Sequence, residues 1–228
     1  MSYAWHVSMK THLNCFRRTG VAFTLLELMI SIAVVGIVVV VLLPGLMPRR
    51  RHHDPIIRCV NNLKQVGLSF RLWAGDNGEK YPMRVPVAKG GTLELVNEGK
   101  AAPHFVVLSN ELGTPKLLAC QVDANREAAT NFASLQDANV SYFINLSATE
   151  ENPQMWLAGD RNMVIGKATV QGLVDVKPDT QADWSEAMHN RRGAMAFADG
   201  SVQQLTSRKL LDSLRAQTNI TSRLVFPQ

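Results

Sequence analysis

The chain has 228 residues, enough for a membrane segment and one modest domain but too few for two large domains. Its formal net charge of +5 would by itself suggest nucleic acid or an acidic membrane surface as a partner. Three of the excess positive charges, however, are Lys10, Arg17 and Arg18, in a segment (1–22) that contains no acid. The rest of the chain is close to neutral, so we expect no nucleic-acid partner.

An apolar run follows at 28–47, with the sequence LMISIAVVGIVVVVLLPGLM. It contains no charged residue and has the length that crosses the hydrocarbon core of a bilayer as a helix. A helix of a soluble protein is rarely apolar on every face for so long. Pro44 and Pro48 do not suit the small-x-small site that ends a secretory signal peptide. The sequence therefore predicts one membrane helix that is kept in the mature protein.

Glu27 lies at the start of this apolar run, within FTLLELMIS. A charged carboxylate costs roughly 2.5–3.5 kcal/mol at the centre of a membrane helix and less near the interface. Two interpretations remain open for Glu27. Its side chain lies at the membrane surface, or it meets a positive charge that another subunit supplies.

The motif Phe23-Thr24-Leu25-Leu26-Glu27-Leu28 resembles the start of a mature type IV pilin or type II secretion pseudopilin. The resemblance implies that a prepilin peptidase cleaves between Ala22 and Phe23 and then methylates the new amine of Phe23. It also implies that Glu27 neutralises the N-terminal amine of a neighbouring subunit. Members of this family normally have glycine before the cleaved bond, where this chain has Ala22. Pro44 fits the family too, at a place where the helix kinks or locally melts.

The resemblance divides the chain into a cytoplasmic leader (1–22), a transmembrane helix segment (23–48) and an extracytoplasmic head (49–228). It implies a single-pass protein of the inner membrane, with a cytoplasmic N-terminus and a periplasmic head. Basic residues flank the apolar run on both sides, so charge alone does not orient it. The implied partners are prepilin peptidase, other pseudopilins in a homo- or hetero-filament, an inner-membrane assembly platform with its motor ATPase, and membrane lipids.

The head begins with a predicted amphipathic helix at 55–76, which ends at Asp76-Asn77-Gly78. Its apolar stripe consists of Ile56, Val60, Leu63, Gly67, Phe70 and Ala74. Short runs predict strands at 105–108, 117–120, 140–145 and 155–158. The expected fold class is α+β and pilin-like: a long N-terminal helix, half transmembrane and half amphipathic, packed on a small antiparallel sheet.

The C-terminal region predicts a hairpin, a short helix at 208–216 and a last strand at 223–227. Asp199-Gly200 between two strand-like runs favours a tight turn in which both residues have positive φ and Phe197 faces Val202. His189 precedes Asp199 and Gly200 in a pattern that resembles the His-x9-Asp-Gly motif of many pseudopilin-like proteins. We expect Asp199 to build the turn and His189 to hydrogen-bond nearby backbone.

The sequence offers no arrangement for catalysis. It has no glycine-rich phosphate loop, no Gly-x-Ser-x-Gly and no histidine pair at ligand spacing, so we predict that the protein is not an enzyme. It has no CxxC and no cysteine–histidine cluster, which argues against a zinc site of the usual spacing. We expect no cofactor; calcium is the alternative, with Asp160, Asp183 and Asp199 as candidate ligands.

Cys59 and Cys120 both follow the membrane segment. In an oxidising compartment they would form a disulfide if their geometry permits it, and otherwise they are two buried thiols.

The sequence thus predicts a pseudopilin subunit of a type II secretion system or type IV pilus-like filament, assembled through its N-terminal helix after processing. The alternative is a membrane-anchored extracytoplasmic binding module that does not polymerise.

Overall fold

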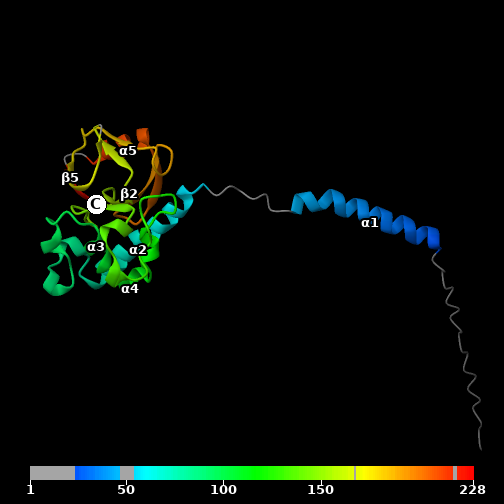
Figure 1. Ribbon diagram of the computed structural model, residues 1–228, viewed down its shortest axis with the longest axis horizontal. Coiled ribbons are helices and arrows are strands. Elements are labelled where there is room, and N and C mark those ends of the chain that lie inside the picture. The colour runs from blue at the N-terminus through cyan, green and yellow to red at the C-terminus, as the bar shows by residue number, and fades with distance from the viewer. Residues whose placement is uncertain (1–23, 47–53, 167, 218–219) are drawn as a thin grey trace, which may run out of the picture. The chain divides into compact units, whose positions relative to one another are not determined.

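The computed structural model describes residues 24–46, 54–166, 168–217 and 220–228 (Figure 1). The chain divides into two compact units, 1–52 and 53–228, and each is described by itself. Together they form an α+β protein with an N-terminal apolar helix and antiparallel sheets, as the sequence predicts.

Helix α1 (Leu25–Leu46) is the described part of the first unit. Its segment from Leu25 to Leu42 is long and apolar enough to cross a membrane. The helix continues through Pro44 to its end at Leu46. By length and composition, α1 is a candidate membrane span.

Helix α2 (Ile56–Asp76) opens the second unit and confirms the predicted amphipathic helix. Its buried side chains extend the predicted stripe, although Val60 is only half-buried. The buried set is Ile56, Cys59, Leu63, Val66, Gly67, Ser69, Phe70, Trp73 and Ala74. The helix ends where the sequence predicts, with Gly78 in the left-handed region at a φ of 68°.

Six antiparallel strands form the main sheet in the order β5-β9-β1-β2-β7-β8. They are β1 (Tyr142–Asn145), β2 (Trp156–Asp160), β5 (Gly172–Val176), β7 (Arg192–Phe197), β8 (Val202–Thr206) and β9 (Ser222–Phe226). A smaller antiparallel sheet has the order β4-β3-β6, formed by β3 (Met163–Ile165), β4 (Ala168–Thr169) and β6 (Ala182–Trp184). The small sheet and β5 were not predicted.

The main sheet is covered on both faces. In Figure 1, α2 lies on one side of β2 and helix α5 (Ser207–Ala216) on the other. On strand β1, Tyr142 and Ile144 join the core under α2, whereas Phe143 joins a second core with Trp184 and Leu210. Successive side chains of a strand point to opposite faces. This alternation therefore divides the interior into two apolar layers with the sheet between them.

Short helices and helical turns connect α2 to β1. Two of them lie where the sequence predicted strands, so the predictions at 105–108 and 117–120 are wrong. The run 105–108 ends helix α3 and the turn after it, and the run 117–120 lies in and just after η4. Pro103 and Pro115 each stand in the first turn of these elements, where the missing N–H costs nothing. The connecting elements are α3 (Ala102–Val106), α4 (Ser109–Leu112), η1 (Pro82–Arg84), η2 (Val87–Lys89), η3 (Leu93–Leu95), η4 (Pro115–Leu118), η5 (Phe132–Ser134) and η6 (Asp137–Asn139).

The hairpin between β7 and β8 has a three-residue turn, not the predicted two-residue one. The N–H of Gly200 donates to the Phe197 carbonyl at 2.9 Å, and of the two expected turn residues only Gly200 has a positive φ, 83°. Asp199 builds the turn as expected, because its Oδ1 accepts the N–H of Ser201 at 2.8 Å. The extra residue shifts the register, so Val202 pairs with Ala196 and not with Phe197.

The packing of the second core, which contains Trp184, can be tested at Gly193 on β7. A Cβ on Gly193 would lie 2.5–2.6 Å from ring atoms of Trp184, which is itself buried. We expect Gly193→Ala to lower the free energy of unfolding by about 1–3 kcal/mol, because the indole has no room to move away.

The measurement is urea unfolding of the full chain in detergent, followed by tryptophan fluorescence. The matched control is Gly75→Ala at an exposed position of α2, where nothing lies within 4 Å of the new Cβ and stability stays equal or rises by up to about 1 kcal/mol. Equal stability of both variants would contradict the described packing.

Candidate functional site

Glu27 lies in the first turn of α1, and its side chain is exposed. Its backbone N–H donates to Thr24 Oγ1 at 3.3 Å, so Thr24 caps the start of the helix. Threonine followed three residues later by glutamate is the capping-box pattern, and a negative charge is favourable at a helix N-terminus. This pattern, which the sequence reasoning missed, gives the charge of Glu27 a favourable position at the helix start. Ala22 and Phe23 lie outside the described residues.

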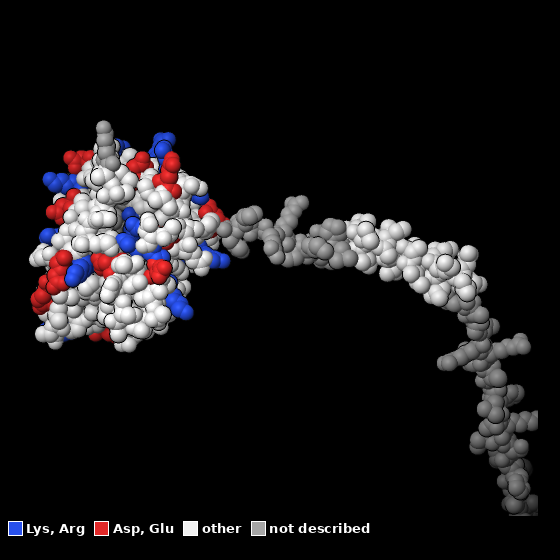
Figure 2. Space-filling model, viewed as in Figure 1, with Lys and Arg blue, Asp and Glu red and all other residues white. Residues whose placement is uncertain are grey.

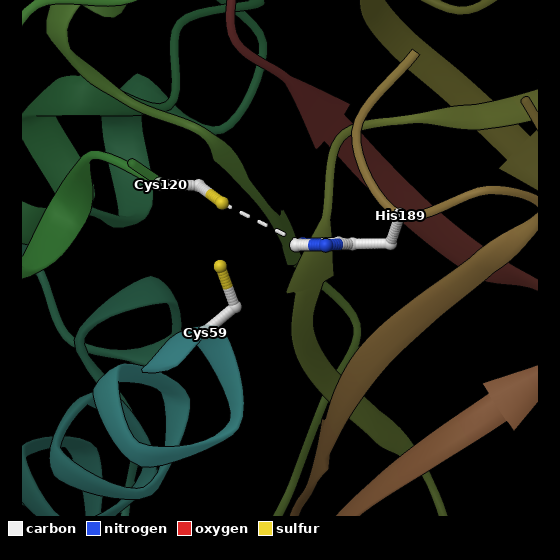
Figure 3. Close-up of side chains that lie close together, drawn as sticks. All are labelled: Cys59, Cys120 and His189. Atoms are coloured by element: carbon white, nitrogen blue, oxygen red, sulfur yellow. Dashed lines mark hydrogen bonds between the residues drawn. The ribbon is translucent and has the colours of Figure 1, made fainter. Parts of the chain in front are cut away.

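The head contains a buried group of three reactive side chains. Cys59 comes from α2, Cys120 follows η4, and His189 precedes β7. Their two sulfur atoms and one imidazole nitrogen all lie within 4.8 Å of one another (Figure 3). Cys120 Sγ and His189 Nε2 are 3.5 Å apart. The expectation that the chain holds no cysteine–histidine cluster is therefore wrong. The three residues are far apart in the sequence, so no local spacing indicates that the fold brings them together.

Asp160, at the end of β2, is a fourth member of this cluster. Its Oδ2 lies 3.5 Å from His189 Nε2 and also accepts the N–H of Ala194 at 2.7 Å. Its Oδ1 is buried and has no hydrogen-bond partner among the described residues. Burial raises the pKa of Asp160 to about 7, against the opposing effect of the His189 charge. We use the term buried cluster for Cys59, Cys120, Asp160 and His189.

The two thiols of the buried cluster are inequivalent. The contact with Cys120 and burial both raise the pKa of Cys59 above its ordinary value. The contact with Cys59, followed by that with His189, lowers the pKa of Cys120 to about 5. Burial by itself lowers the pKa of His189, but Cys120 and Asp160 raise it above its usual value. The electrostatics of the site therefore favour a thiolate at Cys120 over one at Cys59.

Polar side chains around the buried cluster hold Cys120 in place. The Cys120 N–H donates to Ser141 Oγ at 3.0 Å, and the Ser141 hydroxyl donates to Asp123 Oδ2 at 2.9 Å. Asp123 in turn accepts two hydrogen bonds from Arg161, each 2.6 Å long. Burial alone would raise the pKa of Asp123, but the hydrogen bonds and charge of Arg161 hold it below the usual range.

A second short chain of polar contacts fixes the His189 backbone. Arg192 Nε donates to the His189 carbonyl at 3.4 Å, and Arg192 Nη2 donates to Asp54 Oδ2 at 2.7 Å. Asp54 lies just before α2, so this contact also joins the start of that helix to the loop that carries His189.

The remaining predicted site residues have mixed outcomes. The His189 ring contacts Cys120 and Asp160, so the expected bond from His189 to nearby backbone is wrong. Both cysteines are free thiols, which is the second of the two states expected for them. The three candidate calcium ligands form no convergent group among the described residues. Asp160 is in the buried cluster, Asp183 accepts the Trp184 N–H on the small sheet, and Asp199 serves the hairpin turn.

A separate surface pocket of about 680 Å³ lies beside η2, η3 and α3. Its lining is mostly apolar and includes Val87, Leu95 and Val106, with Lys100 as its one basic side chain. Asp137 also lines it, but its carboxylate already accepts the N–H groups of Ala101, Ala102 and Gln228.

Comparison with known proteins gives no relative on which to base an assignment. No protein-family model matches the chain, and no curated protein or solved structure is significantly similar to it.

The ion pair between Arg161 and Asp123, which supports Cys120, should contribute measurably to the stability of the head. The Asp123 side chain is only 2% exposed, so Arg161→Met would leave a buried carboxylate without its cation. We expect a loss of about 3–5 kcal/mol in the free energy of unfolding, measured by urea unfolding of the full chain in detergent.

The matched control is Arg191→Met, which removes the pair between Arg191 and Glu186, exposed by 68% and 73%. That variant should change stability by at most about 1 kcal/mol. Adding Asp123→Asn to Arg161→Met should recover part of the loss, since the unpaired charge is then gone. Similar small losses from both single variants would show that the buried pair does not support the site.

Proposed function

We propose that this protein is a pseudopilin-like subunit, anchored in the inner membrane by α1 and assembled through that helix with other subunits into a filament. The observation that carries this proposal is that α1 is long and apolar enough to cross a membrane and has apolar side chains on every face. Its large apolar side chains are 46% (Val39) to 76% (Leu25) exposed. Burying apolar surface is the main favourable term in folding and association, so lipid or neighbouring helices must cover α1.

The charge distribution supports the same division of roles. Figure 2 shows the Lys, Arg, Asp and Glu side chains of the described residues gathered over the head, whereas the visible face of α1 is uncharged. Glu27 is the one acidic residue of α1. Lipid alone gives a carboxylate little compensation, whereas a helix from another subunit can bring a positive charge to it.

The proposed partner of Glu27 is the amine of Phe23 on a neighbouring subunit, set free when prepilin peptidase cleaves after Ala22. An ammonium and a carboxylate offset each other's desolvation when they meet in a medium of low dielectric constant, and either alone is penalised. The pair would thus form only between correctly placed subunits. Extraction from the membrane would be driven by an assembly platform and its motor ATPase.

The head also offers an apolar surface to neighbours. Ile57, Leu68 and Leu72 are 45%, 56% and 52% exposed, and on a helix of 3.6 residues per turn they lie opposite the buried stripe of α2. Leu68 and Leu72 lie about one turn apart, whereas Ile57 lies about three turns earlier. These exposed apolar side chains, on a helix whose other face is packed, suit contact between heads in a filament.

A binding module that never polymerises is the second candidate function. The mostly apolar pocket beside η2, η3 and α3 has the size of a small-molecule site, and Lys100 would favour an anionic group in the ligand. This function needs α1 only as an anchor and gives Glu27 no partner.

Substitutions of Glu27 can distinguish the effect of its charge from its effect on the start of the helix. Glutamine serves the third helical position of a capping box as well as glutamate does, but it has no charge. We expect Glu27→Gln to reduce cross-linked oligomers at least tenfold in cells, with unchanged membrane insertion, whereas Glu27→Asp retains most of them. The oligomers are measured by cross-linking the full chain with a reagent that does not react with lysine, followed by immunoblots of membrane fractions. Oligomers at the wild-type level in Glu27→Gln would restrict Glu27 to the start of the helix and favour the anchored binding module.

A further inference from the structure

The buried cluster contains the donor atoms of a transition-metal site. Thiolate and imidazole together are the ligands that zinc prefers in proteins, with Zn–S near 2.3 Å and Zn–N near 2.0–2.1 Å. In a tetrahedral site with those bond lengths, ligand atoms lie about 3.4–3.8 Å apart. Cys120 Sγ and His189 Nε2 are 3.5 Å apart, and Cys59 Sγ lies within 4.8 Å of both. Shifts on the order of 1 Å would bring all three donors to one ion.

Asp160 lies beside these three donors, although it is outside the group whose atoms are all within 4.8 Å of one another. Its Oδ2 is 3.5 Å from the same His189 nitrogen, which is again the separation of two ligands of one zinc ion. The side chain is completely buried and its Oδ1 lacks a partner among the described residues. Buried polar atoms almost always have partners, so an orphan carboxylate oxygen on a residue that contacts His189 is consistent with a cation site here.

The surroundings of these donors also resemble a prepared metal site. Ligands of metals are normally oriented by hydrogen bonds from a surrounding layer of side chains. Here Ser141, Asp123 and Arg161 hold the Cys120 backbone, and Arg192 holds the His189 carbonyl. None of the four donors is exposed, as in structural zinc sites, which leave no open coordination position.

We propose that Cys59, Cys120 and His189 bind one Zn²⁺ ion, with Asp160 moving in as the fourth ligand. The ion would fasten α2 to the loop after η4, to the loop before β7 and to the end of β2. The ligands come from four segments that are far apart in the sequence, so a bound ion would cross-link the core of the head. Zinc is also the occupant that accounts for all four groups. A disulfide would join the two sulfurs but leave His189 and Asp160 unexplained.

The test uses the reduced full-length protein in detergent, stripped with a chelator and then titrated with Zn²⁺ or Co²⁺. We expect one equivalent of tightly bound Zn²⁺ by elemental analysis. Co²⁺ should give the intense visible absorption of a tetrahedral ion and the near-ultraviolet band of cobalt–thiolate bonds. Thermal unfolding should shift upward when Zn²⁺ is added.

Variants assign the binding to these residues. Cys59→Ser or Cys120→Ser should remove the thiolate band and weaken binding at least a hundredfold, and Asp160→Asn should weaken it at least tenfold. The matched control is Cys15→Ser, which alters the one other cysteine of the chain and should bind as the wild type does. Because a cysteine variant could fail to fold, the cobalt spectrum of the wild type is decisive by itself. Its absence in the reduced protein, or a native disulfide between Cys59 and Cys120 without bound metal, would overturn the proposal. Neither result bears on filament assembly.

Discussion

The packing of α2 on the six-stranded sheet is the contact on which the rest of the head depends. Nine residues of α2 are buried, and strands β1 and β2 are buried along their whole length. A strand that presents large apolar side chains on both faces needs a cover on each. One cover is α2, and the other is formed by the small sheet with α5, where Trp184, Leu210 and Leu214 meet Phe143 and Phe226. The second layer is thus a consequence of the sheet's composition.

The buried cluster stands out within this apolar interior, because it places four titratable groups where charges are costly. Their mutual contacts reduce that cost, and the proposed zinc ion would remove most of it. The cluster lies near the beginning of α2, which is the end of that helix closer in sequence to α1. If the subunit is pulled out of the membrane by its N-terminal helix, the pulling force would be transmitted to the head at the start of α2. A cross-link there would keep the helix on the sheet.

Periodicity predicted the elements that have strong patterns. Helices α2 and α5 and strands β1, β2, β7, β8 and β9 all lie where apolar spacing placed them. The wrong and missing predictions have physical causes. Val106 and Val107 are β-branched residues typical of strands, although they lie at the end of α3. The strands of the small sheet are too short to show an alternating pattern. The buried cluster could not be predicted by spacing, because 61 and 69 residues separate Cys120 from Cys59 and His189. One signal was available, since Cys59 falls on the buried face of α2, four residues before Leu63.

Processing at the N-terminus is the step on which the proposed function rests, since it creates the amine that Glu27 would neutralise. The direct measurement is intact-mass and N-terminal peptide analysis of the protein purified from native membranes. The account predicts a chain that begins at Phe23 and carries one added methyl group, despite alanine at position 22. A chain in native membranes that retains residues of the segment 1–22 would contradict assembly as a processed pseudopilin. The anchored binding module would then be the better description.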